Sequence, residues 1–313
     1  MKKIAKILLT GSTGMVGRCI LFNKKSSNFK FLTPSRKKLN LLNYSNVYNY
    51  IKKNKPDIII HAAGIVGGIH KNLKEPKKFL VENIEIGKNV ILSAHLNKVK
   101  KMINLSSSCV YSPHSKGPLK ENQILEGKFE SSNEAYAYAK VFNTLLCNYI
   151  NKENNKYNYK TLIPCNLFGE YDSFDPKKSH LVASIIFKIN QAIKTKKKSV
   201  EIWGNGLSRR EFMFTRDFSD FIFFSIKNFH KLPDNINVGM GYDFRIIDYY
   251  KKVKKVLNWE GNFTYNKNKP SGQKRKLLNI KNQKTLGWMP KYSLEKSIKI
   301  TNEYYLKNEK SNN

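Results

Sequence analysis

Three glycines stand between the first predicted strand of the chain and its first predicted helix. Ile4–Leu9 is an apolar run typical of a buried strand, and apolar residues recur at helical spacing from Met15 to Lys24. Glycines at such a junction let the backbone turn sharply and approach a pyrophosphate, whose charge the helix N-terminus stabilises. The spacing is GxxGxxG rather than the usual GxGxxG, so a plain tight turn is the alternative. We expect a dinucleotide-binding loop made of Gly11, Ser12, Thr13, Gly14, Met15, Val16 and Gly17.

Strand and helix patterns alternate through the first half of the chain. Further strands are predicted at Phe29–Thr33, Asp57–Ala62, Lys101–Leu105 and Lys160–Pro164, with helices at Val47–Lys53, Phe79–Asn97 and Glu134–Ile150. This alternation predicts an α/β fold of Rossmann type, with a doubly wound parallel sheet. Beyond residue 165 the pattern is mixed, with helices expected near 181–195, 215–228, 244–257 and 293–307.

The change of pattern near residue 165 also predicts the domain organisation. We expect a nucleotide-binding domain over residues 1–165, to which a segment of about 207–238 returns. Residues 166–313 are then mainly a smaller, mixed α/β substrate-binding domain that is discontinuous in sequence. Hydrophobic residues make up 40% of the chain, which is enough for cores of this size.

The chain carries 57 Lys and Arg against 23 Asp and Glu, a formal net charge of +34 at pH 7. Such a charge suggests nucleic acid or an anionic membrane as a partner. Only 7 of these cations are Arg, however, which is the residue that most often reads bases and binds phosphate in a bidentate way. We therefore interpret the excess of Lys as a bias of exposed positions, and expect neither nucleic acid nor membrane as a partner.

The cysteines and the apolar segments indicate the compartment. Cys19, Cys109, Cys147 and Cys165 form no CxxC pair, and no His cluster has the spacing of a zinc site. We expect free thiols in a reducing compartment and no metal site. No stretch approaches 18 apolar residues, and Lys6 interrupts the apolar start before it reaches the length of a signal sequence. The expectation is a soluble, cytoplasmic protein.

The end of the second predicted strand distinguishes between two cofactors. An NAD enzyme usually has an acidic residue there, which binds the 2′-hydroxyl of the ribose. Here the sequence is Thr33-Pro34-Ser35-Arg36, without a carboxylate and with a guanidinium suited to a phosphate. The sequence favours NADPH over NADH, although Arg36 could also be one more solvated cation.

Tyr136 and Lys140 form a Y-x-x-x-K pair on the predicted helix Glu134–Ile150. Residues four positions apart share a helix face, so the Lys140 ammonium can lie near the Tyr136 phenol and favour its ionised form. Such a tyrosine can exchange a proton with a carbonyl oxygen while hydride moves to the carbon. The hydroxyl of Ser107, after the fourth predicted strand, lies where ligands of open α/β sheets bind and can bond a substrate carbonyl.

These motifs together resemble the extended short-chain dehydrogenase/reductase family. The resemblance rests on the glycine loop, the His61-Ala62-Ala63-Gly64 run, the segment from Ser106 to Tyr111, and the Tyr136/Lys140 pair. Finer features are similar to the GDP-L-fucose synthases of that family and extend over essentially the whole chain. These features are Val66-Gly67-Gly68-Ile69, Asn133-Glu134-Ala135-Tyr136, Asn166-Leu167-Phe168-Gly169, Ser179-His180, Trp203-Gly204-Asn205-Gly206, Arg209-Arg210-Glu211-Phe212 and Arg275-Lys276-Leu277-Leu278.

The resemblance implies NADPH-dependent 3,5-epimerisation and 4-keto reduction of GDP-4-keto-6-deoxy-D-mannose to GDP-L-fucose. Ser107 would bind the C4 oxygen, Tyr136 would donate its proton, and Lys140 would hold the nicotinamide ribose. Cys109 and His180 match the base and acid that invert the neighbouring carbons, whereas without the resemblance Cys109 could be a small buried hydrophobe. In an extended segment Ser107 and Cys109 would point to the same face.

The resemblance also implies binding residues outside the catalytic group. For the cofactor they are Asn40, Leu41, Ala62, Ala63, Gly64, Lys140, Pro164, Cys165, Asn166, Leu167 and His180, beside the glycine loop and Arg36. For the GDP-sugar they are Lys188, Trp203, Arg210 and Ser271, the last standing where the family usually has Asp. A homodimer through the helices Phe79–Asn97 and Glu134–Ile150 is expected by analogy.

Two alternatives stay open at this point. The enzyme could act on a related GDP-4-keto-deoxy sugar, such as a precursor of colitose or a deoxyheptose. The chain could also be a non-catalytic Rossmann-like protein that binds a polyanion through its lysines. Dehydration is not expected, because Ser108-Cys109 offers no carboxylate where the sugar-nucleotide dehydratases of the superfamily have one.

Overall fold

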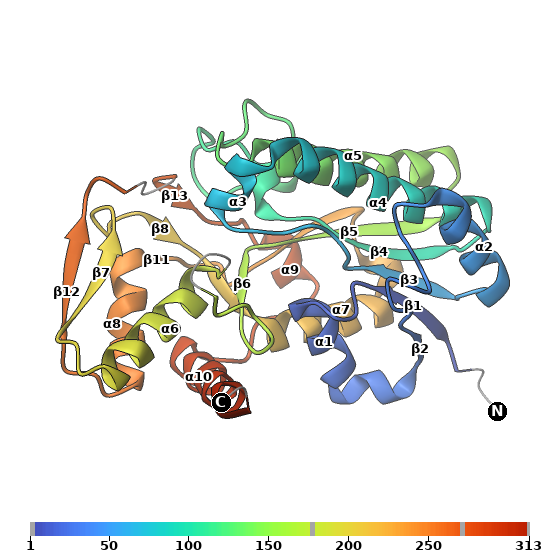
Figure 1. The fold of residues 1–313 in the computed structure, drawn as a ribbon. Coiled ribbons are helices and arrows are strands. Elements are labelled where there is room, and N and C mark those ends of the chain that lie inside the picture. The colour runs from blue at the N-terminus through green and yellow to red at the C-terminus, as the bar shows by residue number, and fades with distance from the viewer. Residues whose placement is uncertain (1–3, 176–178, 270–272, 312–313) are drawn as a thin grey trace.

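A six-stranded parallel sheet in the order β10-β5-β4-β3-β1-β2 forms the centre of the larger part of the molecule (Figure 1). The computed structural model describes residues 4–175, 179–269 and 273–311. The strands are β1 (Lys6–Thr10), β2 (Lys30–Leu32), β3 (Ile58–His61), β4 (Lys101–Leu105), β5 (Asn158–Pro164) and β10 (Asn235–Val238). Every pairing in this sheet is parallel, so the carboxyl ends of the strands share one edge.

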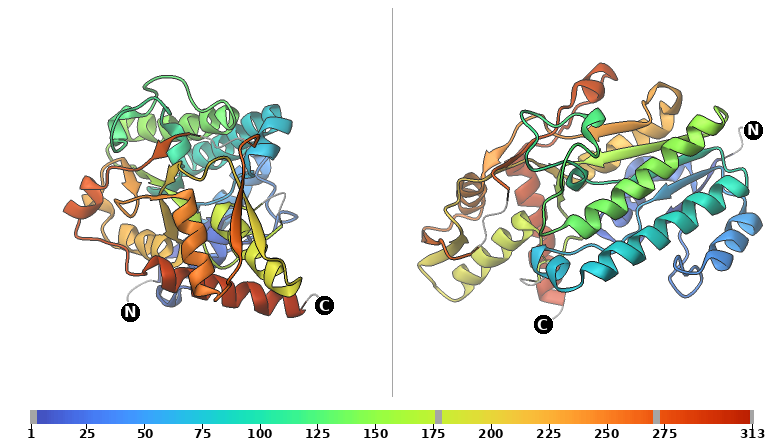
Figure 2. Two further views of the ribbon diagram at one scale, coloured as in Figure 1. Left: turned by 90° about the vertical axis from the view of Figure 1, so that its left-hand side faces the viewer. Right: turned by 90° about the horizontal axis from the view of Figure 1, so that it is seen from above.

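Helices cover both faces of this sheet, which is why β1 and β3 each carry three consecutive buried apolar residues. On one face lie α2 (Tyr44–Asn54), α4 (Pro76–Leu96) and α5 (Glu134–Glu153), with the short α3 (Ile69–Lys74). Seen from above, α4 and α5 run side by side over the sheet (Figure 2). On the opposite face lie α1 (Met15–Phe22) and α7 (Thr215–Lys227).

The second part of the molecule is a mixed α/β unit. Its helices are α6 (Leu181–Lys194), α8 (Ile246–Val256) and α10 (Leu294–Ser311), with the short α9 (Lys281–Thr285) nearer the large sheet. Its strands pair as β7 (Ser199–Trp203) with β12 (Asn262–Asn266), and β8 (Arg209–Arg210) with β11 (Phe244–Arg245) and β13 (Arg275–Lys276). A third small sheet, β6 (Asn166–Phe168) with β9 (Phe212–Phe214), lies between the two parts.

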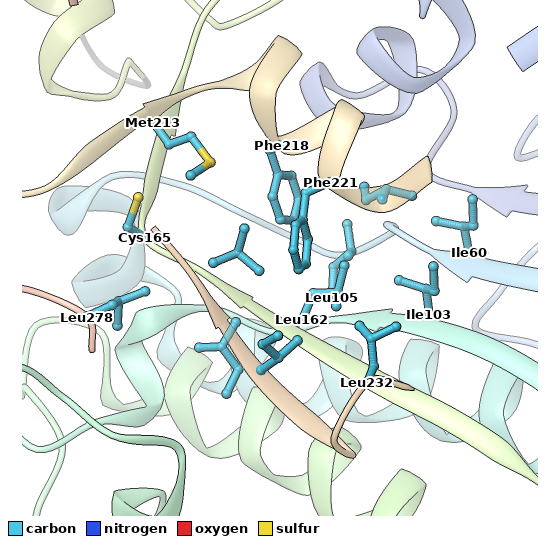
Figure 3. Packing of buried hydrophobic residues seen from close by; sticks show 14 of the residues in the cluster. Ile60, Ile103, Leu105, Leu162, Cys165, Met213, Phe218, Phe221, Leu232 and Leu278 are labelled. Carbon is cyan, nitrogen blue, oxygen red and sulfur yellow. The ribbon is translucent and has the colours of Figure 1, made fainter. Parts of the chain in front are cut away.

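One hydrophobic core continues from the large sheet toward the second part (Figure 3). Leu105 and Leu162 of the sheet pack with Phe218 of α7, and the same cluster includes Met213 of β9 and Leu278. A second core lies among α6, α8 and α10, and a third lies under α2 and α4. Because β9 and Leu278 belong to the first core, continuous apolar packing holds the second part against the sheet.

The structure confirms the predicted fold class, an α/β protein with a parallel sheet of Rossmann type and a smaller mixed unit. The predicted elements are present with their ends moved by a few residues. The pattern did not predict the short helices α3 and α9, or the 3₁₀ segments at Lys24–Asn28, Ser108–Val110, Glu121–Gln123 and Phe229–Lys231. Elements of one turn are too short to show a hydrophobic period.

Gly87→Ala is expected to lower the free energy of unfolding by about 1–3 kcal/mol, the usual cost of overpacking a buried site. A Cβ on Gly87 of α4 would lie 2.1 Å from the side-chain amide of buried Asn143 on α5. Urea denaturation measures the loss. Gly68→Ala is the control, because a Cβ there meets nothing within 4 Å. Equal stability of the two variants would contradict the close approach of α4 and α5.

Candidate active site

A cavity of about 670 Å³ opens along the carboxyl edge of the large sheet. Its wall is built mainly from the segments at and after the ends of successive strands, at residues 10–17, 34–36, 39–42, 62–68, 105–109 and 164–167. His180 and Lys276 complete the wall from the second part of the chain, and Tyr136 and Lys140 complete it from α5. Ligands of open α/β sheets bind at this edge, so the cavity lies where the fold predicts a site.

The glycine loop between β1 and α1 leaves no room for a side chain at Gly11 or Gly17. Gly11 has a φ of +72°, and a Cβ there would lie 2.7 Å from the backbone of Ala62. A Cβ on Gly17 would lie 2.1 Å from the carbonyl oxygen of Gly11. No side chain caps the N-terminus of α1, which begins on the cavity wall after Gly14. The loop therefore fits a pyrophosphate held by backbone N–H groups.

All the residues predicted to bind the cofactor lie on the wall of this cavity. Beyond the glycine loop, Lys140 and His180, they are Arg36, Asn40 and Leu41 after β2, Ala62, Ala63 and Gly64 after β3, and Pro164, Cys165, Asn166 and Leu167 from the end of β5 into β6. Arg36 is exposed, and none of the ion pairs in the described part of the chain involves it. The guanidinium is therefore available to a phosphate.

Ser107 and Cys109 follow β4 and both reach the cavity wall. The prediction of an extended segment is wrong, because only Ser107 is extended and Ser108–Val110 form a 3₁₀ turn. The turn is closed by the Ser107 Oγ, which accepts a hydrogen bond from the Cys109 N–H at 3.4 Å. The thiol is 4% exposed, and this burial raises its pKa, although the Lys276 ammonium acts in the opposite direction.

Tyr136 and Lys140 share one face of α5, as predicted from their spacing, and both line the cavity. The Lys140 Nζ lies 5.5 Å from the centre of the Tyr136 ring and donates a hydrogen bond to the Leu105 carbonyl at 2.8 Å. Burial lowers the pKa of Lys140 to about 8. Burial also raises the pKa of Tyr136 well above its ordinary value, an effect that the spacing of the two residues did not predict. The phenol is therefore held protonated, as a proton donor must be.

His180 enters the cavity from the residue that precedes α6. Its Nδ1 lies 3.1 Å from the Oδ1 of Asp172, and this hydrogen bond raises the pKa of the imidazole. Sequence reasoning missed Asp172, because no motif connects it to a residue eight positions later. It also missed a role for Lys276, which comes to the cavity wall from β13.

Three of the residues predicted to bind the GDP-sugar, Lys188, Trp203 and Arg210, do not line this cavity. Lys188 and Trp203 lie together on α6 and β7, with the ammonium 5.6 Å from the centre of the ring. Trp203 is 52% exposed, and the Lys269 ammonium also lies 5.6 Å from its ring. Arg210 donates hydrogen bonds to two backbone carbonyls, those of Arg209 and Gln273. Ser271 lies outside the described residues.

Among residues 4–175, 179–269 and 273–311, no group of three or more His, Cys, Asp or Glu side chains is arranged to hold a metal ion. No helix in the same ranges is both long and apolar enough to cross a membrane.

The fold and the site define a nicotinamide-dependent enzyme of the extended short-chain dehydrogenase/reductase class. Residues 7–239 match the model of the NAD dependent epimerase/dehydratase family, and the chain belongs to this family. Family membership confirms the predicted class of cofactor, a nicotinamide dinucleotide, which the glycine loop fits.

Similar proteins place the chain among the GDP-sugar epimerases and reductases. It is 50% identical to GDP-L-colitose synthase of Yersinia pseudotuberculosis, over 98% of this chain and 99% of the relative. It is 44% identical to GDP-L-fucose synthase of Azorhizobium caulinodans, over 98% of both chains. The crystal structure of a GDP-6-OMe-4-keto-L-xylo-heptose reductase from C. jejuni superposes with a TM-score of 0.90 at 27% identity, over 98% of this chain and 99% of that one. The resemblance to the GDP-L-fucose synthases is confirmed.

Proposed function

We propose that the chain epimerises and reduces a GDP-linked 4-keto-6-deoxy sugar with NADPH, in the cytoplasm. One observation carries the proposal. Ser107, Cys109, Tyr136 and His180 meet on the wall of one cavity that also contains the glycine loop. These side chains are a carbonyl-binding hydroxyl, a thiol, a protonated phenol and an imidazole, which are the groups that the two reactions need.

The reduction uses the protonated state of Tyr136. When bound, the cofactor supplies hydride to the carbonyl carbon. The Ser107 hydroxyl donates a hydrogen bond to the carbonyl oxygen, and Tyr136 transfers its proton to that oxygen as negative charge develops there. Lys140, fixed by its bond to the Leu105 carbonyl, provides a positive charge 5.5 Å from the phenol ring that stabilises the resulting phenolate.

The inversion uses a base and an acid on opposite sides of the sugar. The keto group makes hydrogens on the neighbouring carbons acidic. Cys109 acts as its thiolate, which the Lys276 ammonium favours against the effect of burial on the pKa of the thiol. The thiolate removes one of these hydrogens as a proton, and the electrons of the broken C–H bond pass into an enolate. The protonated His180 then gives its proton to the same carbon from the other face, which leaves the inverted ketone, a thiol and a neutral imidazole. Exchange with water restores both groups.

Residues in the second part of the chain are suited to bind the GDP moiety of the substrate. The exposed face of Trp203 suits stacking on a base, and the ammoniums of Lys188 and Lys269 near that ring suit the phosphates. Arg210 is a further candidate for the pyrophosphate. Ser271 replaces the Asp that is usual in GDP-L-fucose synthases and is the substitution that would alter recognition there.

Two sugars are candidates for the substrate. The family resemblance favours GDP-4-keto-6-deoxy-D-mannose, which would give GDP-L-fucose. The 50% identity to a GDP-L-colitose synthase favours the GDP-4-keto-deoxy precursor of colitose instead. Incubation of the protein with each ketone and NADPH, followed by identification of the product, distinguishes them. Failure to oxidise NADPH with either ketone, together with salt-sensitive RNA binding, would contradict the proposal and leave the polyanion-binding alternative.

A homodimer through α4 and α5 is part of the proposal. These neighbouring helices carry large apolar side chains that are 38–59% exposed, namely Val81, Tyr138, Phe142 and Tyr149. An apolar surface of this kind is typical of a contact between subunits. Sedimentation of the protein as a monomer would contradict it.

Arg36→Ala is expected to weaken NADPH binding by about 10-fold or more, with little change for NADH. The reason is that a charge-assisted hydrogen bond to the 2′-phosphate contributes about 1.5–3 kcal/mol. Fluorescence titration with both cofactors measures the effect. Lys38→Ala removes a neighbouring exposed cation that is not on the cavity wall, and serves as the control. An equal loss for both cofactors would contradict this role of Arg36.

Tyr136→Phe is expected to lower the reduction rate by about 10²-fold or more, the usual contribution of a general acid. Exchange of the hydrogens next to the keto group with D₂O should continue, because Cys109 and His180 remain. NADPH oxidation and NMR of the ketone report the two reactions. Tyr138→Phe, on the same helix but 46% exposed, should behave as wild type. Unchanged reduction in Tyr136→Phe would disprove the assignment.

Cys109→Ala is expected to stop inversion while slow reduction of the uninverted ketone continues. The substitution removes the base but leaves Ser107, Tyr136 and the cofactor site. Product analysis after complete NADPH oxidation separates the two sugar configurations. Cys147→Ala, which removes a thiol buried under α4 and away from the cavity, is the control and should give normal product. Normal product from Cys109→Ala would exclude this thiol as the base.

A further inference from the structure

We propose that Asp172 is a positioning residue that holds His180 in the orientation and charge state required of the acid in the inversion. The inference rests on the proposed function and adds a residue to it. The two residues come from different segments, since Asp172 lies in the turn after β6 and His180 immediately precedes α6.

The three residues that precede Asp172 in the turn after β6 are held by their contacts with other segments. Gly169 has a φ of +154°, and a Cβ there would lie 2.2 Å from the Thr215 Oγ1. Glu170 accepts two hydrogen bonds from the Arg216 guanidinium, at 2.6 and 2.7 Å. Tyr171 adopts a left-handed conformation, with a φ of +65°, which is uncommon for a residue with a side chain.

Aromatic contacts hold Tyr171 in this conformation. Its ring stacks on Phe22 of α1 with the ring centres 5.5 Å apart, and meets the Tyr304 ring of α10 edge-on at 4.9 Å. The Arg18 guanidinium lies 5.5 Å from the centre of the same ring. Helices from both parts of the molecule thus pack against the residue that precedes Asp172. A left-handed residue persists only where its surroundings determine it in this way.

The Asp172 carboxylate is buried, with a side chain that is 4% exposed. Its Oδ1 accepts hydrogen bonds from the Ser173 N–H at 2.8 Å and from His180 at 3.1 Å. Its Oδ2 is also buried and has no hydrogen-bond partner in the part of the chain that the structure describes. A buried carboxylate oxygen without a partner is costly, so contacts within the turn alone do not account for this residue.

The hydrogen bond to Asp172 determines which ring nitrogen of His180 can act on a ligand. Because a carboxylate accepts hydrogen bonds, Nδ1 carries a proton and donates it, which leaves Nε2 for the cavity. Asp172 is also the group that raises the pKa of His180, so the doubly protonated ring persists to higher pH. Among the described residues, the other titratable or charged side chains on the cavity wall are Arg36, Glu82, Cys109, Tyr136, Lys140, Cys165 and Lys276.

Asp172→Asn separates this role from a purely structural one. The amide keeps the size of the side chain and an oxygen that accepts the Ser173 N–H, but it removes the charge. Glu170→Gln is the matched control, because it neutralises a carboxylate of the same turn that bonds Arg216 rather than His180. Loss of folding stability alone would affect both variants, whereas loss of the charge beside His180 affects only the first.

The first readout does not depend on substrate. In protein labelled with ¹⁵N-histidine, the His180 signal is assigned by its absence in His180→Gln and followed against pH. We expect its pKa to lie above the ordinary value in wild type and in Glu170→Gln, and to fall in Asp172→Asn. The same titration pKa in all three proteins would overturn the inference even if the proposed function is correct.

The second readout uses the ketone that wild type reduces. For Asp172→Asn we expect inversion to slow roughly 10- to 100-fold, part of the effect of a positioned acid, while the affinity for NADPH changes less than about 2-fold. The alkaline limb of the inversion rate should move to lower pH, because an acid with a lower pKa loses its proton earlier. Equal losses of inversion and cofactor binding would show a structural effect and overturn the inference. If wild type reduces no GDP-ketone while the titration gives the expected shift, the proposed function fails and the Asp172–His180 pairing stands.

Discussion

The close packing of the glycine turn on the end of β3 is the constraint on which the site depends. A Cβ at Gly11 would overlap the backbone of Ala62, so the turn touches the neighbouring strand directly and α1 begins at the cavity wall. Helix α1 is in turn linked to α7 by Ser219. The Ser219 hydroxyl donates a hydrogen bond to the Cys19 carbonyl and accepts one from the Asn23 side chain. Because β9 runs directly into α7, the packing of this glycine turn also orients β9, which connects α7 to the second part of the chain.

A buried carboxylate holds the other side of the site together. Glu211, between β8 and β9, accepts hydrogen bonds from the N–H groups of Met240, Gly241 and Leu278. Burial raises the pKa of this carboxyl to about 7, although the three hydrogen bonds act in the opposite direction. The bond to Leu278 fixes the chain two residues after Lys276, the cation on the wall beside Cys109. A structural hydrogen-bond network thus sets the electrostatics of a proposed catalytic thiol from a segment distant in sequence.

The sequence predicts those features that depend on local spacing. The periodicity of apolar residues predicted the alternating elements, and the separation of four predicted that Tyr136 and Lys140 share a face. The effect of burial, which raises the pKa of Tyr136, was not predicted, because a helical spacing does not report burial. Cys109 lies in a 3₁₀ turn of three residues, which is too short for any pattern to predict. Asp172 and Lys276 reach the site through tertiary contacts, and without a motif the sequence had no means of pairing them with His180 and Cys109.

The net charge of +34 acts on the site through few side chains. Among the residues that the structure describes, the charged groups on the cavity wall are the cations Arg36, Lys140 and Lys276 and one carboxylate, Glu82, with His180 adding charge when it is protonated. Charges farther than about 8 Å are largely screened at physiological ionic strength, so the remaining lysines contribute mainly a weak, salt-dependent attraction of anions toward the molecule. Lys140 is 7% exposed, and burial reduces screening, so its charge acts strongly on a ligand in the cavity. Affinity for an anionic ligand should therefore depend on the wall residues far more than on the number of surface lysines.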